Sequence, residues 1–154
     1  MHLPHLPSFS KQPLLFITTC TAGRHLLLAT ASSHDILKAI WSKSAALDGW
    51  YVGHYLLMPD HLHLFAVPGP EAKPLAIWIK SWKSISSRQL AITRAITPPV
   101  WQGDYFDHFV RSRAAYRLKW TYVQQNPVRQ GLCVESSDWL FQGTLHDIDC
   151  RLAG

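Results

Sequence analysis

Two apolar runs separated by a short turn constrain the fold of this chain more than any other feature. Trp50 to Leu57 and His61 to Val67 are each long enough for a strand, and Met58-Pro59-Asp60 supplies the turn between them. A connection this short joins neighbouring strands that run antiparallel. The chain is therefore predicted to build its sheet around an antiparallel hairpin.

The segment before the hairpin predicts one strand and one helix. Pro13 to Thr19 is rich in apolar and β-favouring residues and precedes a turn near Gly23, as expected of a first strand. Apolar residues then recur at helical spacing from Ile36 to Leu47, with Ser33 as a candidate N-cap and Asp48-Gly49 as a stop. We expect a helix over about 33–47.

The segment after the hairpin predicts a second helix, extended chain and a third helix. Pro74 suits the first turn of a helix whose apolar stripe runs to Leu90, and Pro98-Pro99 ends that region. Extended pieces are expected over 100–106 and 109–110. Ser112 can then cap a helix that ends at about Asn126, because Pro127 disfavours helical geometry in the residue before it.

This order of elements predicts an α+β fold. A β-α-β-β-α-β order with an added C-terminal helix is typical of a ferredoxin-like antiparallel sheet with helices packed on it. The 154 residues, 47% of them hydrophobic, suit a single domain over 1–154. Within it we expect a flexible, Pro-rich leader over 1–12 and an irregular tail over 133–154.

Charge and cysteine content narrow the class of protein. A formal net charge of +5 and a pI near 9.3 favour a polyanionic partner. Cys20, Cys133 and Cys150 lack the spacing of a disulfide framework or a thiolate zinc site, which fits a reducing cytoplasm. No segment approaches the roughly 18 apolar residues of a membrane span. We therefore expect neither export nor a membrane anchor.

His61-Leu62-His63, on the second strand of the hairpin, is the first candidate for chemistry. Because side chains alternate faces along a strand, both imidazoles are expected on one face and Leu62 on the other. Two neutral imidazoles on one face can provide half of a metal site. The alternative is an ordinary pair, which chance readily produces in a chain with nine histidines.

Tyr122 and Asn126 form the second candidate. They are four residues apart on a predicted helix, so they lie on one face and can act at one site. A tyrosine nucleophile, with an ordinary pKa near 10, needs a base or a phosphate polarised by a metal ion. The alternatives are that Tyr122 packs the helix onto the sheet and that Asn126 only serves the turn before Pro127.

The second half of the chain carries most of the positive charge. Acidic residues are nearly absent between Glu71 and Arg129, and Trp78, Trp82, Trp101 and Trp120 are interleaved with the basic ones. A basic surface with stacking aromatics suits unpaired DNA bases, whereas solvated helix faces with core tryptophans are the alternative. The candidate DNA-binding residues are Arg24, Lys80, Lys83, Arg88, Arg111, Arg113, Arg117 and Arg129.

Three stretches in fixed order resemble the single-tyrosine HUH transposases, and more closely the REP-associated tyrosine transposases. They are GHYLLMPDHLHLFAV (53–67), WQGDYFDHFVRS (101–112) and YRLKWTYVQQNPVRQGL (116–132), and the opening FITTCTAGRHLLL is also similar to that family's first strand and turn. The resemblance spans about residues 14–132. It implies a ferredoxin-like sheet with the histidine pair on a central strand and the tyrosine on an adjoining helix.

The resemblance also implies roles for single residues. His61 and His63 match the metal ligands, and Tyr122 matches the nucleophile that forms a 5′-phosphotyrosine while DNA is cleaved and rejoined beside a hairpin. Asn126 falls at the third ligand, although Gln124 or Gln125 could replace it, since many relatives use glutamine there. The implied cofactor is Mg²⁺ or Mn²⁺, and the implied partner is single-stranded or hairpin DNA in the cytoplasm, at the nucleoid.

Several alternatives stay open at this stage. The chain could be a retired relative that grips repeat hairpins without cutting them, or a metal-dependent phosphodiesterase that uses water. Insertion-sequence relatives work as homodimers with exchanged helices, whereas REP-associated relatives can act as monomers. The sequence decides neither the oligomeric state nor whether the protein moves an element or serves dispersed repeats.

Overall fold

Five strands form one antiparallel sheet in the computed structural model, which describes residues 14–148. The order across the sheet is β4-β1-β3-β2-β5. The strands are β1 (Leu14–Cys20), β2 (Trp50–Leu57), β3 (His61–Pro68), β4 (Phe106–Val110) and β5 (Gln142–Thr144). The predicted hairpin is therefore present as β2 and β3, and β3 lies at the centre of the sheet.

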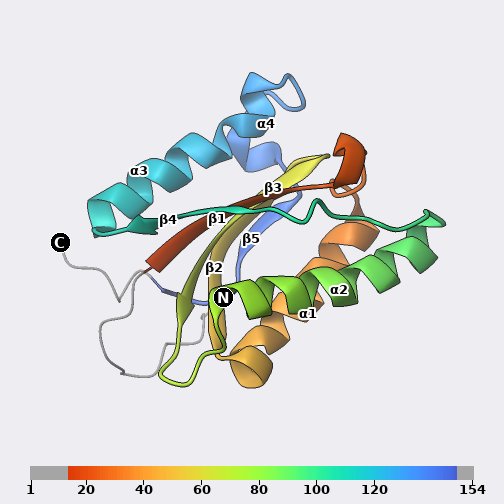
Figure 1. Ribbon diagram of the computed structural model, residues 1–154. Coiled ribbons are helices and arrows are strands. Elements are labelled where there is room, and N and C mark those ends of the chain that lie inside the picture. Colours follow the sequence, from red (N-terminus) through yellow and green to blue (C-terminus); the bar gives the residue numbers. More distant parts are fainter. Residues whose placement is uncertain (1–13, 149–154) are drawn as a thin grey trace.

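Helices cover both faces of this sheet (Figure 1). The helices α1 (Ala31–Asp48) and α2 (Leu75–Arg94) lie on one side, whereas α3 (Arg113–Gln124) and the short α4 (Asn126–Arg129) lie on the other. Short 3-10 turns occupy Ala22–Arg24 and Ser136–Asp138. The predicted α+β fold, with an antiparallel sheet and an added C-terminal helix, is confirmed.

Alternation along β3 separates two hydrophobic clusters. Leu62, Leu64 and Ala66 are buried in the cluster that α1 and α2 cover. Phe65 and Val67 belong to the second cluster, beneath α3. His61 and His63 follow the same alternation as Phe65, so both imidazoles lie on the α3 face.

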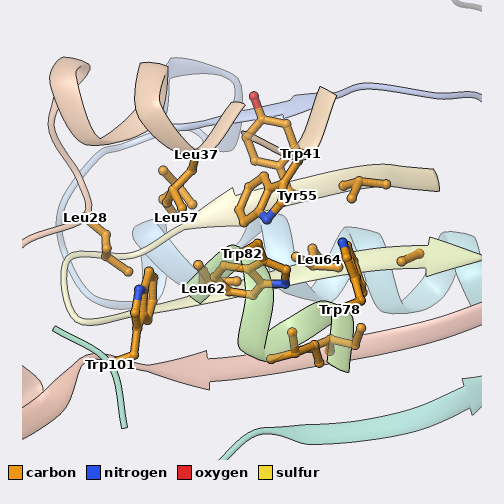
Figure 2. Close-up of a cluster of buried hydrophobic side chains, with 14 of the residues drawn as sticks. Leu28, Leu37, Trp41, Tyr55, Leu57, Leu62, Leu64, Trp78, Trp82 and Trp101 are labelled. Carbon is orange, nitrogen blue, oxygen red and sulfur yellow. The ribbon is translucent and has the colours of Figure 1, made fainter. Parts of the chain in front are cut away.

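Tryptophans form the centre of the larger cluster (Figure 2). Trp78 and Trp82 are at most 1% exposed and Trp101 is 6% exposed, so none of them is available to stack on a DNA base. Trp120 is half-buried and stacks on His54 with ring centroids 4.5 Å apart. The prediction of surface aromatics among the basic residues is therefore wrong for Trp78, Trp82 and Trp101, because α2 and the segment after it direct these indoles inward.

Several element boundaries differ from the prediction, and the extended pieces expected over 100–106 and 109–110 are replaced by one strand, β4, over Phe106–Val110. The first helix begins at Ala31 rather than Ser33, because the Thr30 hydroxyl accepts the Ser33 backbone N–H at 3.2 Å. Residues 133–148 are less irregular than expected, since β5 pairs with β2. The predicted leader, Cys150 and the end of the tail lie outside the described residues. Among residues 14–148, the helices are too short or too polar to span a membrane.

Candidate metal and nucleophile site

Both histidines of the HLH pair have their Nδ1 atoms held by neighbouring side chains. His61 Nδ1 lies 2.8 Å from Asp60 Oδ1, and His63 Nδ1 lies 2.7 Å from Thr18 Oγ1. An imidazole that donates from Nδ1 keeps the lone pair on Nε2 free to accept or to bind a metal ion. The two rings are thus oriented with Nε2 outward from β3.

Asn126 lies where these two lone pairs converge. Its side-chain amide is 3.2 Å from His61 Nε2 and 3.4 Å from His63 Nε2. The amide N–H can donate to either nitrogen, and a half-turn of the amide would place Oδ1 at the same point. Two imidazole nitrogens and one amide oxygen suit a divalent cation.

A short chain of ionic contacts supports His61. Arg24 donates from Nε to Asp60 Oδ2 at 2.9 Å, while the other carboxylate oxygen faces His61. Partial burial acts to raise the pKa of the Asp60 carboxyl, but the hydrogen bonds from His61 and Arg24 outweigh it and lower that pKa. Asp60 therefore stays a carboxylate, which keeps the Nδ1 proton on His61.

His63 is held neutral by its surroundings. Burial lowers its pKa to about 3, and the electrostatic effects of His61, Lys119 and Arg129 act in the same direction. The Phe16 ring stacks on the imidazole with centroids 5.3 Å apart. A neutral imidazole is the form that binds metal ions.

Tyr122 reaches solvent beside this cluster. Its side chain is 63% exposed, and the Arg129 guanidinium lies 4.2 Å from its ring centroid. Within residues 14–148, its hydroxyl makes no hydrogen bond to the histidine pair or to Asn126. The packing role is taken by Tyr116, which is buried and stacks on Phe65 with centroids 4.5 Å apart. Tyr122 is thus an exposed phenol near the end of α3, and the candidate ligand Asn126 begins α4 rather than continuing the single helix predicted for both residues.

The predicted DNA-binding residues divide between two faces of the sheet. Lys80, Lys83 and Arg88 are on α2, away from the histidines, whereas Arg113, Arg117 and Arg129 are on α3 and α4. Arg24 follows β1, and Arg111 follows β4 beside the Phe109 ring.

Lys83 does not belong to the basic surface on which it was expected. It is 8% exposed, and its ammonium donates to the carbonyl oxygens of Gln102 and Asp104 at 2.8 and 3.0 Å. Burial lowers its pKa to about 8. Its hydrogen bonds tie α2 to the 102–104 segment, which is a structural role.

Two residues at the site were missed in the sequence. Asp60 and Thr18 orient the histidines. Lys119, a basic residue of α3, lies with Nζ 5.0 Å from the Phe16 ring centroid. The signal for Asp60 was its place directly before His61. Thr18 could be found only from the strand register, which pairs it with His63.

Comparison with known proteins finds similarity to a transposase. No family model matches the sequence. A REP-associated tyrosine transposase of Escherichia coli (strain K12) is 25% identical over 117 residues, which cover 75% of this chain and 64% of that relative. The chain is thus similar to a REP-associated tyrosine transposase. The resemblance predicted from the sequence motifs is thereby confirmed, over less than two thirds of that relative's length.

Solved structures support the same fold. A REP-associated tyrosine transposase bound to a REP hairpin matches with a TM-score of 0.66 at 21% identity, over 99% of this chain and 92% of that chain. A candidate transposase from Deinococcus radiodurans R1 matches with a TM-score of 0.57 at 19% identity, over 80% of this chain and 98% of that chain. The arrangement of sheet and helices is shared with both.

Proposed function

We propose that this chain is a metal-dependent, single-tyrosine transposase that cleaves and rejoins single-stranded DNA beside hairpins. The observation that carries the proposal is the convergence of His61 Nε2 and His63 Nε2 on the side chain of Asn126, which begins α4 four residues after Tyr122 of α3. The relative in Escherichia coli and the structural neighbour bound to a REP hairpin support hairpin DNA as the substrate. A nucleoid-associated place in the cytoplasm would follow from that substrate.

The residues present fit a divalent cation. His61 and His63 would hold Mg²⁺ or Mn²⁺ through Nε2, with Asn126 as the third ligand through Oδ1. When bound, the cation supplies a positive charge that polarises a phosphate oxygen and offsets negative charge in the transition state. Asp60 and Thr18 would keep both imidazoles in the required orientation.

Tyr122 would attack the scissile phosphate. A bond forms between the phenolic oxygen and phosphorus while the bond from phosphorus to the 3′-oxygen breaks, and the phenolic proton is balanced by protonation of that 3′-oxygen. The products are a 5′-phosphotyrosine and a free 3′-OH. Arg129, with its guanidinium 4.2 Å from the Tyr122 ring centroid, is placed to offset negative charge on the phenol and on a nearby phosphate.

Rejoining would use the same residues in reverse. The phosphotyrosine retains the energy of the broken phosphodiester, so a second 3′-OH can displace Tyr122 and restore a DNA strand without ATP. The phenol regains its proton in that step. Cations on α3 and α4 would hold the DNA backbone on the histidine face.

A catalytically retired hairpin-binding protein is the second candidate. The observation in its favour is that the Tyr122 hydroxyl contacts neither histidine in the described residues. The third candidate is a phosphodiesterase that uses water as the nucleophile. In that case Tyr122 would have only a structural role.

Incubation with labelled single-stranded hairpin DNA and Mn²⁺, followed by denaturing electrophoresis, separates these candidates. We expect a slow-migrating protein-DNA adduct that disappears in Tyr122→Phe and after chelation, but persists in the matched variant Tyr116→Phe. Cleavage without an adduct would favour the phosphodiesterase. Tight binding without cleavage would favour the retired protein.

A further inference from the structure

Phe106 presents an exposed aromatic ring on the histidine face of the sheet. Its side chain is 59% exposed although phenylalanine normally avoids solvent. Along β4 the side chains of Phe106 and His108 share one face, and their rings pack edge to face at 5.6 Å. His108 in turn contacts Phe16, which stacks on His63. Phe106 therefore lies on the same face as the metal ligands.

Strand register places Phe106 close to the site. Thr18 of β1 is the partner of Phe106 on one side and of His63 on the other. Two strand spacings separate Phe106 from His63, or about 10 Å between their backbones. A stacked DNA strand advances about 3.4 Å per nucleotide, so this is a reach of about three nucleotides or fewer.

A cation lies on the same face of the sheet as the Phe106 ring. Lys119 on α3 has its ammonium 5.0 Å from the centroid of the Phe16 ring. Phe16 belongs to β1, the strand that lies between Phe106 of β4 and His63 of β3. The Lys119 charge also lowers the pKa of His108, after the effect of burial. An exposed aromatic and a cation on one surface are the combination with which proteins bind unpaired bases and their phosphates.

We propose that Phe106 is a stacking platform for an unpaired nucleobase of the strand that enters the histidine site, with Lys119 contacting an adjoining phosphate. This inference rests on the proposed function and adds a base subsite to it. Stacking tolerates any base because every base has an aromatic face, so the subsite would position the strand rather than read its sequence. Phe106 would thus be a positioning residue for the phosphate at the metal site.

The same strand supplies a matched control. Phe109 is 50% exposed and is paired with Leu15, whose side chain belongs to the cluster under α1 and α2. It therefore faces away from the histidines. Phe109→Ala removes an exposed ring from β4 as Phe106→Ala does, but from the opposite face.

The test is equilibrium binding of a DNA hairpin whose unpaired flank carries 2-aminopurine at one position at a time. In wild type we expect quenching at a flank position, and Phe106→Ala should abolish it and weaken binding of the flanked hairpin by about 5- to 100-fold. Phe106→Trp should restore both signals, and Phe109→Ala should resemble wild type. Binding of the hairpin without a flank should be equal in all four proteins.

Two results would overturn the inference alone. The first is a Phe106→Ala protein that binds, quenches and forms the Tyr122 adduct as Phe109→Ala does. The second is a dimeric wild type and a monomeric Phe106→Ala protein that bind DNA equally well. That result would make the ring a contact between copies of the chain. Failure of wild type to bind any hairpin would overturn the proposed function together with this subsite.

Discussion

The His63 imidazole has a charge state that differs between the folded and the unfolded chain. Burial first, and then nearby positive charge, lowers its pKa to about 3 in the folded protein, against about 6.5 for an ordinary histidine. Between these values the unfolded chain binds more protons than the folded one. Stability therefore rises with pH across this window and is lost as the pH falls from 6.5 towards 3.

Urea denaturation between pH 7 and pH 4, with a chelator present, measures this effect. We expect the free energy of unfolding of wild type to fall by on the order of a few kcal/mol over that range. His63→Asn should show a shallower decline. Parallel curves for the two proteins would contradict the account of His63 as a buried neutral group.

Asp60 is expected to strengthen metal binding by orienting His61. Asp60→Ala removes the acceptor of the Nδ1 proton and leaves Arg24 without its carboxylate partner. Loss of such an orienting carboxylate typically weakens metal binding by about 10- to 100-fold. Calorimetric titration with Mn²⁺ should show this loss for Asp60→Ala and wild-type affinity for Asp107→Ala on the edge strand. Equal Mn²⁺ affinities of Asp60→Ala and Asp107→Ala would mean that the Asp60 carboxylate does not orient the His61 imidazole for metal binding.

Single residues were the part of the site least accessible from sequence. The HLH spacing placed His61 and His63 on one face, since strand alternation is a local property. The burial of Lys83 could not be foreseen, because a lysine on an amphipathic helix looks the same whether its ammonium meets water or two backbone carbonyls. Its burial depends on the path of residues 102–104, which are distant in sequence.

At the scale of elements, the end of α1 depends on a left-handed glycine. Gly49 has φ +77, and a Cβ there would lie 2.7 Å from the Cα of Ala72. Gly131 has a similar φ of +73, but a Cβ there would meet nothing within 4 Å. The two glycines share the conformational requirement and differ in the space around them.

Thermal unfolding of Gly49→Ala and Gly131→Ala should separate these two effects. Gly131→Ala should cost about 1 kcal/mol, from the left-handed conformation alone. Gly49→Ala should cost clearly more, about 2–4 kcal/mol, because the Ala72 backbone must also move. Equal losses would show that the contact with Ala72 relaxes freely.

Elements with strong periodicity were predictable, and weakly patterned ones were not. The hairpin and the helices that became α1, α2 and α3 follow from apolar spacing with Gly and Pro stops. The sequence predicted Ser33 as the N-cap of α1, whereas Thr30 is the N-cap in the structure. Both residue types cap helices, and which of them does so depends on where the preceding loop packs. The strand β5 has only three residues and exists because it can add to the edge of β2.

At the scale of the whole molecule, the cations are divided between two faces of the sheet, and the proposed function requires DNA to contact those on the histidine face. Arg129 lies on the histidine face, whereas Arg88 projects from α2 on the other. If the substrate lies over the histidines, Arg129→Gln should lower the slope of log K against log salt by about 0.7, the value for one single-strand phosphate contact. Arg88→Gln should leave the slope unchanged, as fluorescence anisotropy over a salt series would show. Equal changes would place DNA on both faces.

The central claim is that Tyr122 becomes covalently bonded to DNA, and peptide mapping tests it most directly. Trypsin would release Tyr122 in the peptide WTYVQQNPVR (120–129), which contains no other tyrosine, and Tyr116 in the separate peptide AAYR (114–117). After reaction with hairpin DNA and Mn²⁺ and digestion by nuclease and trypsin, mass spectrometry should find the nucleotide phosphate on Tyr122 in peptide 120–129. Cleaved DNA with both peptides unmodified, or the phosphate on Tyr116, would contradict the account.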